Sequence, residues 1–138
     1  MYLKRSVIVG FGIILASMGI AQAQSVRLLG DYNDWSAYTT AQGAGKLCFV
    51  LSKPQDVRPQ PDGYSASYLY LTHRPGEGVR NEFNFVAGYM LAPETPANLR
   101  IGSTSYDLFT ETDAAWLDDP AQTESVAGNM RAGSSLII

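Results

Sequence analysis

Cysteine and histidine are almost absent from the sequence, which contains one of each among 138 residues. Because Cys48 is the only cysteine, an intramolecular disulfide is excluded. A zinc site needs converging cysteine, histidine or carboxylate ligands, and Cys48 and His73 stand at unrelated positions without a spaced set of carboxylates. We therefore expect no metal site and no other cofactor. Cys48 lies in the apolar segment Leu47–Leu51 and is expected to be a small buried side chain.

Motifs of the common catalytic sites are also missing. The sequence has no G-x-S-x-G turn for a serine nucleophile. The acidic pair Asp118 and Asp119 precedes a proline, which fits helix capping better than acid–base chemistry. Catalytic carboxylates can come together from distant positions, so a hydrolase of that kind stays open as an alternative. The sequence itself identifies no catalytic residue.

One long apolar run is present, and it lies near the N-terminus. The run from Ser6 to Ile20 follows Lys4 and Arg5 and precedes Ala21-Gln22-Ala23. A basic start, an apolar run and a small-x-small site together are typical of a cleavable signal peptide. The run is shorter than the ~20 residues that cross a bilayer. We expect residues 1–23 to be removed, and residues 24–138 to form one domain in the periplasm or outside the cell, without stable membrane insertion.

Charge is scarce, and its balance is acidic. The chain has 10 Lys and Arg against 13 Asp and Glu, so loss of Lys4 and Arg5 leaves eight against thirteen, a formal charge of −5. Nucleic-acid binding depends on neutralising phosphates, which needs a basic surface. The balance therefore argues against a nucleic-acid partner and against adhesion to an anionic membrane.

Short β segments separated by turns fill most of the chain between residues 26 and 117. At residues 68–72, Tyr68, Tyr70 and Thr72 alternate with two leucines, which predicts a strand with two different faces. Strands are expected over residues 26–29, 34–39, 46–52, 68–72, 81–90, 99–101 and 106–109. Hairpins are expected at 43–45 and 102–105, and a bulge or close backbone approach at Gly88. This pattern predicts an all-β sandwich or barrel.

One short helix is expected near the C-terminus. Asp119 can cap its first turn, Pro120 suits the first helical position, and Gly133 suits the end. A further apolar strand is expected at residues 136–138. The side chains expected to share one face of the helix are Gln122, Val126 and Met130.

Two loops are the expected contact surfaces. Segment Lys53–Gly63 contains three prolines and is long for a connection, and His73–Val79 is a turn at a sheet margin. Tyr64 borders the first loop, and tyrosine is common at interfaces. Packing within the domain is an equal alternative for Tyr64, and support of its own turn is an alternative for His73. The candidate contact residues are Tyr64, His73, Arg74 and Glu77.

Several stretches, in order along nearly all of the chain after residue 23, resemble the invasion-associated locus B family of exported bacterial proteins. The stretches are Gly30–Tyr38, Lys46–Pro54, Thr72–Pro75 with Val79–Glu82, Ala114–Leu117, and Asn129–Ser134. They resemble the family's F-x-D-W opening, its cysteine strand, its central hairpin, and its C-terminal helix with the following strand. The resemblance implies an immunoglobulin-like β-sandwich with one short C-terminal helix, at the periplasm or surface of Gram-negative cells. No defined enzymatic activity comes with it.

The chain departs from this family in two ways. Family members often carry a second cysteine soon after the tryptophan, where this chain has Tyr38, Thr39 and Thr40. The family also usually continues through another strand after the position where this chain stops, Ile138. A truncation there would leave an apolar sheet edge without a partner strand.

Together these features predict a non-enzymatic interaction module. Its expected partner is a protein of the bacterial envelope or of a host cell, with a role in host-cell invasion or envelope function. The alternative is a periplasmic hydrolase, which a concave pocket with two or more carboxylates would favour. A structural role in the envelope without a dedicated ligand is a third reading.

Export can be tested through the cleavage site. Expression of the full chain in a Gram-negative host should yield a product that begins at Gln24, measured by intact mass spectrometry. Replacing Ala23 with Arg should block processing, because signal peptidase requires a small residue there. Gln22→Arg, at the tolerant position between the two small residues, is the matched control. A normally processed Ala23→Arg variant would contradict the predicted site.

Overall fold

The computed structural model describes residues 25–43 and 45–138, so the predicted signal peptide, residues 1–23, lies outside the described residues. In the described part, nine strands form one antiparallel sheet in the order β1-β2-β3-β4-β5-β8-β7-β6-β9. The strands are β1 (Arg27–Tyr32), β2 (Trp35–Gln42), β3 (Gly45–Ser52), β4 (Tyr68–Arg74), β5 (Val79–Val86), β6 (Ala97–Ile101), β7 (Thr104–Glu111), β8 (Ala114–Leu117) and β9 (Leu136–Ile137). The predicted mainly β fold with one short C-terminal helix is confirmed.

The first five strands follow one another across the sheet, each paired with the next. The β2–β3 and β6–β7 hairpins turn at the two predicted glycine-containing segments. After β5 the order changes, because β8 lies next to β5 and the β6–β7 hairpin lies beyond β8. No separate strand was predicted at β8, since two of its four residues are alanines, which are depleted in strands.

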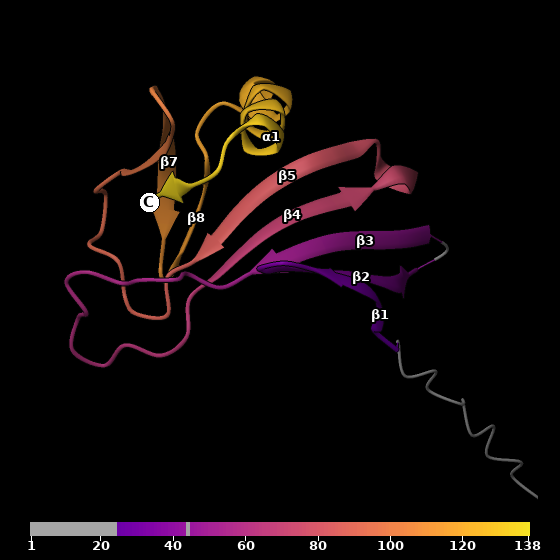
Figure 1. Ribbon diagram of the computed structural model, residues 1–138, viewed down its shortest axis with the longest axis horizontal. Helices are drawn as coiled ribbons and strands as arrows, with labels where there is room; N and C mark the ends of the chain where they lie inside the picture. Colours follow the sequence, from indigo (N-terminus) through magenta and orange to yellow (C-terminus); the bar gives the residue numbers. More distant parts are fainter. Residues whose placement is uncertain (1–24, 44) are drawn as a thin grey trace, which may run out of the picture.

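The sheet is bent, with the helix α1 (Thr123–Ala132) on its inner side. Figure 1 shows β1–β5 as one curved part of the sheet, and β7 and β8 run at a steep angle to it. α1 lies in the angle between the two parts and contacts β5 and β6. A continuous sheet bent in this way is consistent with the predicted sandwich-like all-β class.

The start and end of the helical segment match the sequence prediction. The Asp119 carboxylate accepts a hydrogen bond from the backbone N–H of Ala121 at 2.9 Å. This bond caps a short 3-10 turn, η2 (Pro120–Gln122), which leads directly into α1. Gly133 follows the last helical residue, and its N–H donates to the carbonyl of Asn129. No helix in the described part is long and apolar enough to cross a membrane.

α1 presents a short apolar face to the sheet. Val126 is fully buried, and Ala127 is almost so. The prediction for Gln122 is wrong, because this residue falls in η2 and is exposed. Val126 joins a core made of Leu69, Phe83, Leu99, Ile101, Tyr106, Leu108, Ala115 and Leu117.

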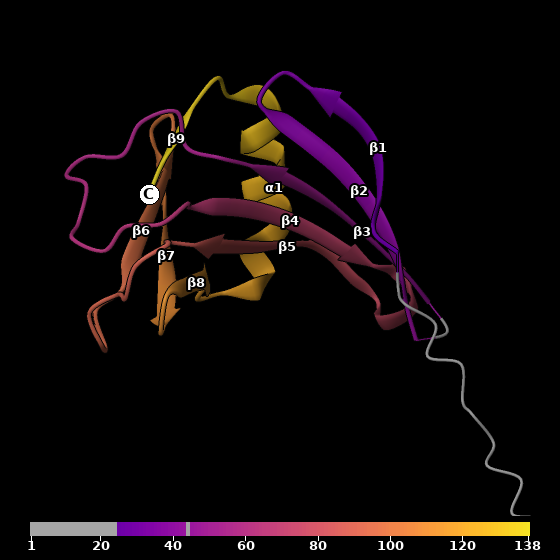
Figure 2. The same cartoon turned by 90° about the horizontal axis from the view of Figure 1, so that it is seen from below.

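This core takes no buried apolar side chain from the first three strands. Among the described residues, every buried apolar side chain comes from β4 or later, and Thr39 is the only buried residue before Ser67. The apolar side chains of β2 and β3 are half-buried instead. The inner face of β2 and β3 therefore extends beyond the region that α1 covers (Figure 2).

Gly88 makes the predicted close backbone approach just after β5. Its φ is +77°, and a Cβ built there would lie 2.7 Å from the carbonyl oxygen of Ala66. Left-handed backbone of this kind favours glycine. The strand predicted over residues 81–90 accordingly ends at Val86.

Comparing Gly88→Ala with Gly102→Ala separates two costs of adding a Cβ: the strain of left-handed backbone and the steric clash with Ala66. Gly102 also has a positive φ, +59°, but no atom lies within 4 Å of a Cβ built there. We expect about 1 kcal/mol of destabilisation for Gly102→Ala from left-handed strain. Gly88→Ala should cost roughly 3 kcal/mol, because a steric clash adds to the strain. Urea unfolding measures both, and equal losses would show that the approach to Ala66 is unimportant.

Candidate functional site

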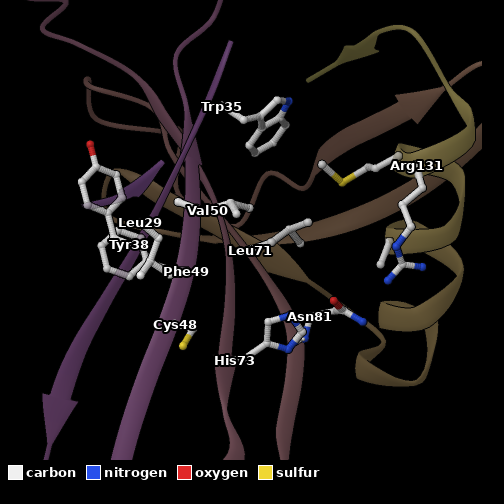
Figure 3. Close-up of a pocket in the computed structure, with 13 residues that line it drawn as sticks. Leu29, Trp35, Tyr38, Cys48, Phe49, Val50, Leu71, His73, Asn81 and Arg131 are labelled. Carbon is white, nitrogen blue, oxygen red and sulfur yellow. Dashed lines mark hydrogen bonds between the residues drawn. The ribbon is translucent and has the colours of Figure 1, made fainter. Parts of the chain in front are cut away.

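An open groove of about 430 Å³ lies between α1 and the inner face of β1–β4. This volume falls in the ~300–1,000 Å³ range of small-molecule sites. Its apolar lining includes Leu29, Trp35, Ala37, Val50, Leu71 and Met130, and Figure 3 shows several of these side chains. Most of these side chains are half-buried, so part of their apolar surface remains in contact with solvent.

Strand register explains how these residues come together. Ala37 on β2 pairs with Val50 on β3, and Val50 pairs with Leu71 on β4. Residues that are directly opposite in neighbouring strands point to the same face, so these three form a row across the sheet. Trp35 lies two positions before Ala37 and shares its face.

One end of the groove is polar. Cys48 and His73 are paired across β3 and β4, one step along the same face from the apolar row. Asn81 lies at this end too, and Arg131 extends from the last turn of α1 toward it (Figure 3). The backbone N–H of Asn81 donates to Nδ1 of His73 at 3.2 Å. An imidazole that accepts at Nδ1 carries its proton at Nε2, so His73 retains one N–H donor.

Asn81 also connects the sheet to the helix. It is buried at the irregular β4–β5 pairing, with φ at +51°, a conformation that asparagine tolerates better than most residues. Its side-chain N–H donates to the Glu124 carboxylate in the first turn of α1, at 2.8 Å. A second link joins the hydroxyls of Tyr106 and Ser125 at 2.9 Å. These bonds fix α1 relative to β5 and β7, and so beside the groove.

Cys48 differs from its predicted role as a buried core side chain. It is half-buried and lines the groove. Its thiol lies 3.6 Å from the Thr39 hydroxyl, to which it donates, and that hydroxyl donates to the carbonyl of Leu47. The hydrogen bond of the thiol is therefore made to Thr39, although His73 is its cross-strand neighbour. In the described part of the chain, no group of three or more His, Cys, Asp or Glu side chains is placed to hold a metal ion.

The candidate contact residues lie at opposite ends of β4. Tyr64 precedes the strand, where its hydroxyl accepts bonds from the N–H and hydroxyl of Ser67, both at 3.3 Å. His73, Arg74 and Glu77 lie at the other end (Figure 1). The structure thus does not bring Tyr64 together with the other three, and of the four only His73 lines the groove.

Arg74 is held in an ion-pair network on the outer side of the β4–β5 hairpin. Its guanidinium makes two 2.7 Å hydrogen bonds to Glu82 and one of 2.9 Å to Glu77. Hydrogen bonding to Glu82 is the main cause that raises the pKa of Arg74, and Glu77 raises it further. The arrangement ties Arg74 and Glu77 to the turn.

Aromatic side chains pack against one another on the outer face. Tyr38 and Phe49 stack at 5.1 Å between ring centroids, and Phe49 lies 6.1 Å from Tyr70. Tyr68 follows at 6.3 Å from Tyr70. Burial, and to a smaller extent the neighbouring Tyr68, raise the pKa of Tyr70. These tyrosines therefore take part in packing along the sheet.

A smaller hollow of about 250 Å³ lies between residues 90–94 and 110–112. It contains two carboxylates, those of Glu94 and Glu111, and both residues are exposed. Two carboxylates in one hollow are the feature named for the hydrolase alternative, and here neither is buried.

Comparison with family models, with curated proteins and with solved structures gives no match for this chain. The resemblance to the invasion-associated locus B family stays a prediction from sequence motifs. The proposed function therefore rests on the geometry of the groove.

The bond between Asn81 and Glu124 can be tested without straining the backbone. Asn81→Gly keeps the left-handed conformation and removes the side-chain bond, so we expect a loss of about 1 kcal/mol in urea unfolding. Glu124→Gln keeps an acceptor oxygen and should lose less. If Asn81→Gly were as stable as the unchanged chain, the bond would not position α1.

Proposed function

We propose that this chain is an extracytoplasmic binding protein that holds a small, largely apolar molecule in the groove beside α1. The observation that carries the proposal is the groove itself, about 430 Å³ in volume, with an apolar row and one polar end. An apolar pocket with a few polar groups at one place is the usual form of a small-molecule site.

Part of the apolar inner face of the sheet is only half-buried. Trp35 and Leu71 pack against the core on one side and are half-buried, as is Val50, whereas α1 contacts β5 and β6. A ligand hydrocarbon chain would take these side chains out of water. Each methylene that is buried contributes about 0.8 kcal/mol, so affinity should rise with chain length until the groove is filled.

The proposal keeps the interaction role expected from the sequence and gives it a defined surface. Export, and a function in host-cell invasion or in the envelope, rest on the signal-peptide pattern and on the family resemblance. A hydrolase would need catalytic carboxylates. The described residues that line the groove include none, and the two in the smaller hollow, Glu94 and Glu111, are exposed. Binding is therefore the function that its chemistry supports best.

Trp35 provides a direct readout of binding. The sequence has two tryptophans, so Trp116→Phe leaves Trp35 as the only one and keeps an aromatic ring beside Phe109. In this background, titration with 1-decanol should change the fluorescence of Trp35 in a saturable way.

Filling the groove should abolish that change. Ala37→Phe places a ring in the apolar row, so we expect decanol binding to fall at least about tenfold. Ala41→Phe is the matched control, because Ala41 is exposed on the same strand and does not line the groove. Equal decanol binding by the two variants would contradict the proposed site.

A further inference from the structure

We propose that the ligand of the groove is an amphipathic anion, whose acid group binds at the polar end beside Arg131 and His73. This inference rests on the proposed function and names the chemical class of the ligand. Its hydrocarbon part would lie along the apolar row of Ala37, Val50 and Leu71.

Arg131 is the charged group of the groove lining. It lies in the last turn of α1 and is exposed, and its guanidinium extends along the helix toward Asn81 (Figure 3). None of the ion pairs or hydrogen bonds found among the described residues uses its side chain. A guanidinium has donors arranged to bind a carboxylate through two parallel hydrogen bonds. Arg131 is therefore available to a ligand acid group.

His73 adds a second hydrogen-bond donor to the groove lining. Because its Nδ1 accepts the N–H of Asn81, the remaining ring proton is at Nε2. The imidazole lines the groove together with Arg131. Arg131 and His73 both present hydrogen-bond donors, which suit an anion. Neither has a carboxylate that would bind a cation.

The nearby acidic groups are already engaged. Glu124 accepts the side chain of Asn81 at the opposite end of α1 from Arg131. Glu82 and Glu77 are both bonded to Arg74. In a chain with an excess of acidic residues, Arg131 is the one fully charged side chain among the described residues that line the groove, and the Glu124 carboxylate bonded to Asn81 lies outside this lining. Charge complementarity favours an acid over an amine of the same length.

The experiment compares three ligands with the same ten-carbon chain and different headgroups. The full chain, expressed with its own N-terminus and carrying Trp116→Phe, is titrated with decanoate, 1-decanol and decyltrimethylammonium. Decanoate should bind about tenfold more tightly than decanol, and the cation more weakly than decanol. If decanol binds and decanoate binds no more tightly, the anion assignment is overturned while the proposed binding function stands. If none of the three binds, both proposals fail.

Arg131→Gln then tests the group that recognises the acid. Decanoate affinity should fall to that of decanol, about tenfold, while decanol affinity stays unchanged. Arg100→Gln is the matched control, because Arg100 is exposed on β6 and does not line the groove. A parallel loss of decanol binding in Arg131→Gln would mean that Arg131 shapes the groove, and this result would overturn its role as the anion-binding group.

Discussion

The packing of α1 on one part of the sheet is the interaction on which the other features depend. Val126 is fully buried together with Leu99 and Leu108, so the helix is fixed over the inner side of β5 and β6. A helix of ten residues cannot cover a sheet of nine strands. The inner face of β2 and β3, with Leu71 and His73 of β4, is left partly open, and the groove exists because of this unequal cover.

The polar end of the groove and the position of the helix are connected through one residue. Asn81 donates its backbone N–H to His73 and its side-chain N–H to Glu124. The first bond fixes which ring nitrogen of His73 carries the proton, and the second holds the start of α1. The orientation of the His73 ring and the position of the start of α1 therefore depend on the same residue, Asn81.

Sequence patterns predicted the elements of this fold better than their assembly. Alternation at residues 68–72 and the capping residue Asp119 predicted a two-faced strand and the helix start, because both depend on local chemistry. Val126 was predicted only to share a helix face with Gln122 and Met130, and the structure places it in the core. The groove was missed, since its lining runs from Leu29 to Arg131 and is brought together by strand order. Cys48 was expected in the core, because an apolar strand does not reveal which part of a sheet a helix will cover.

The reactivity of Cys48 tests the open groove most directly. It is the only cysteine of the chain and lines the groove, so a water-soluble thiol reagent reports on one site. The account predicts that the thiol of the folded chain reacts without denaturant, and that saturating decanoate slows the reaction. A thiol that reacts only after unfolding, or at the same rate with and without decanoate, would contradict it.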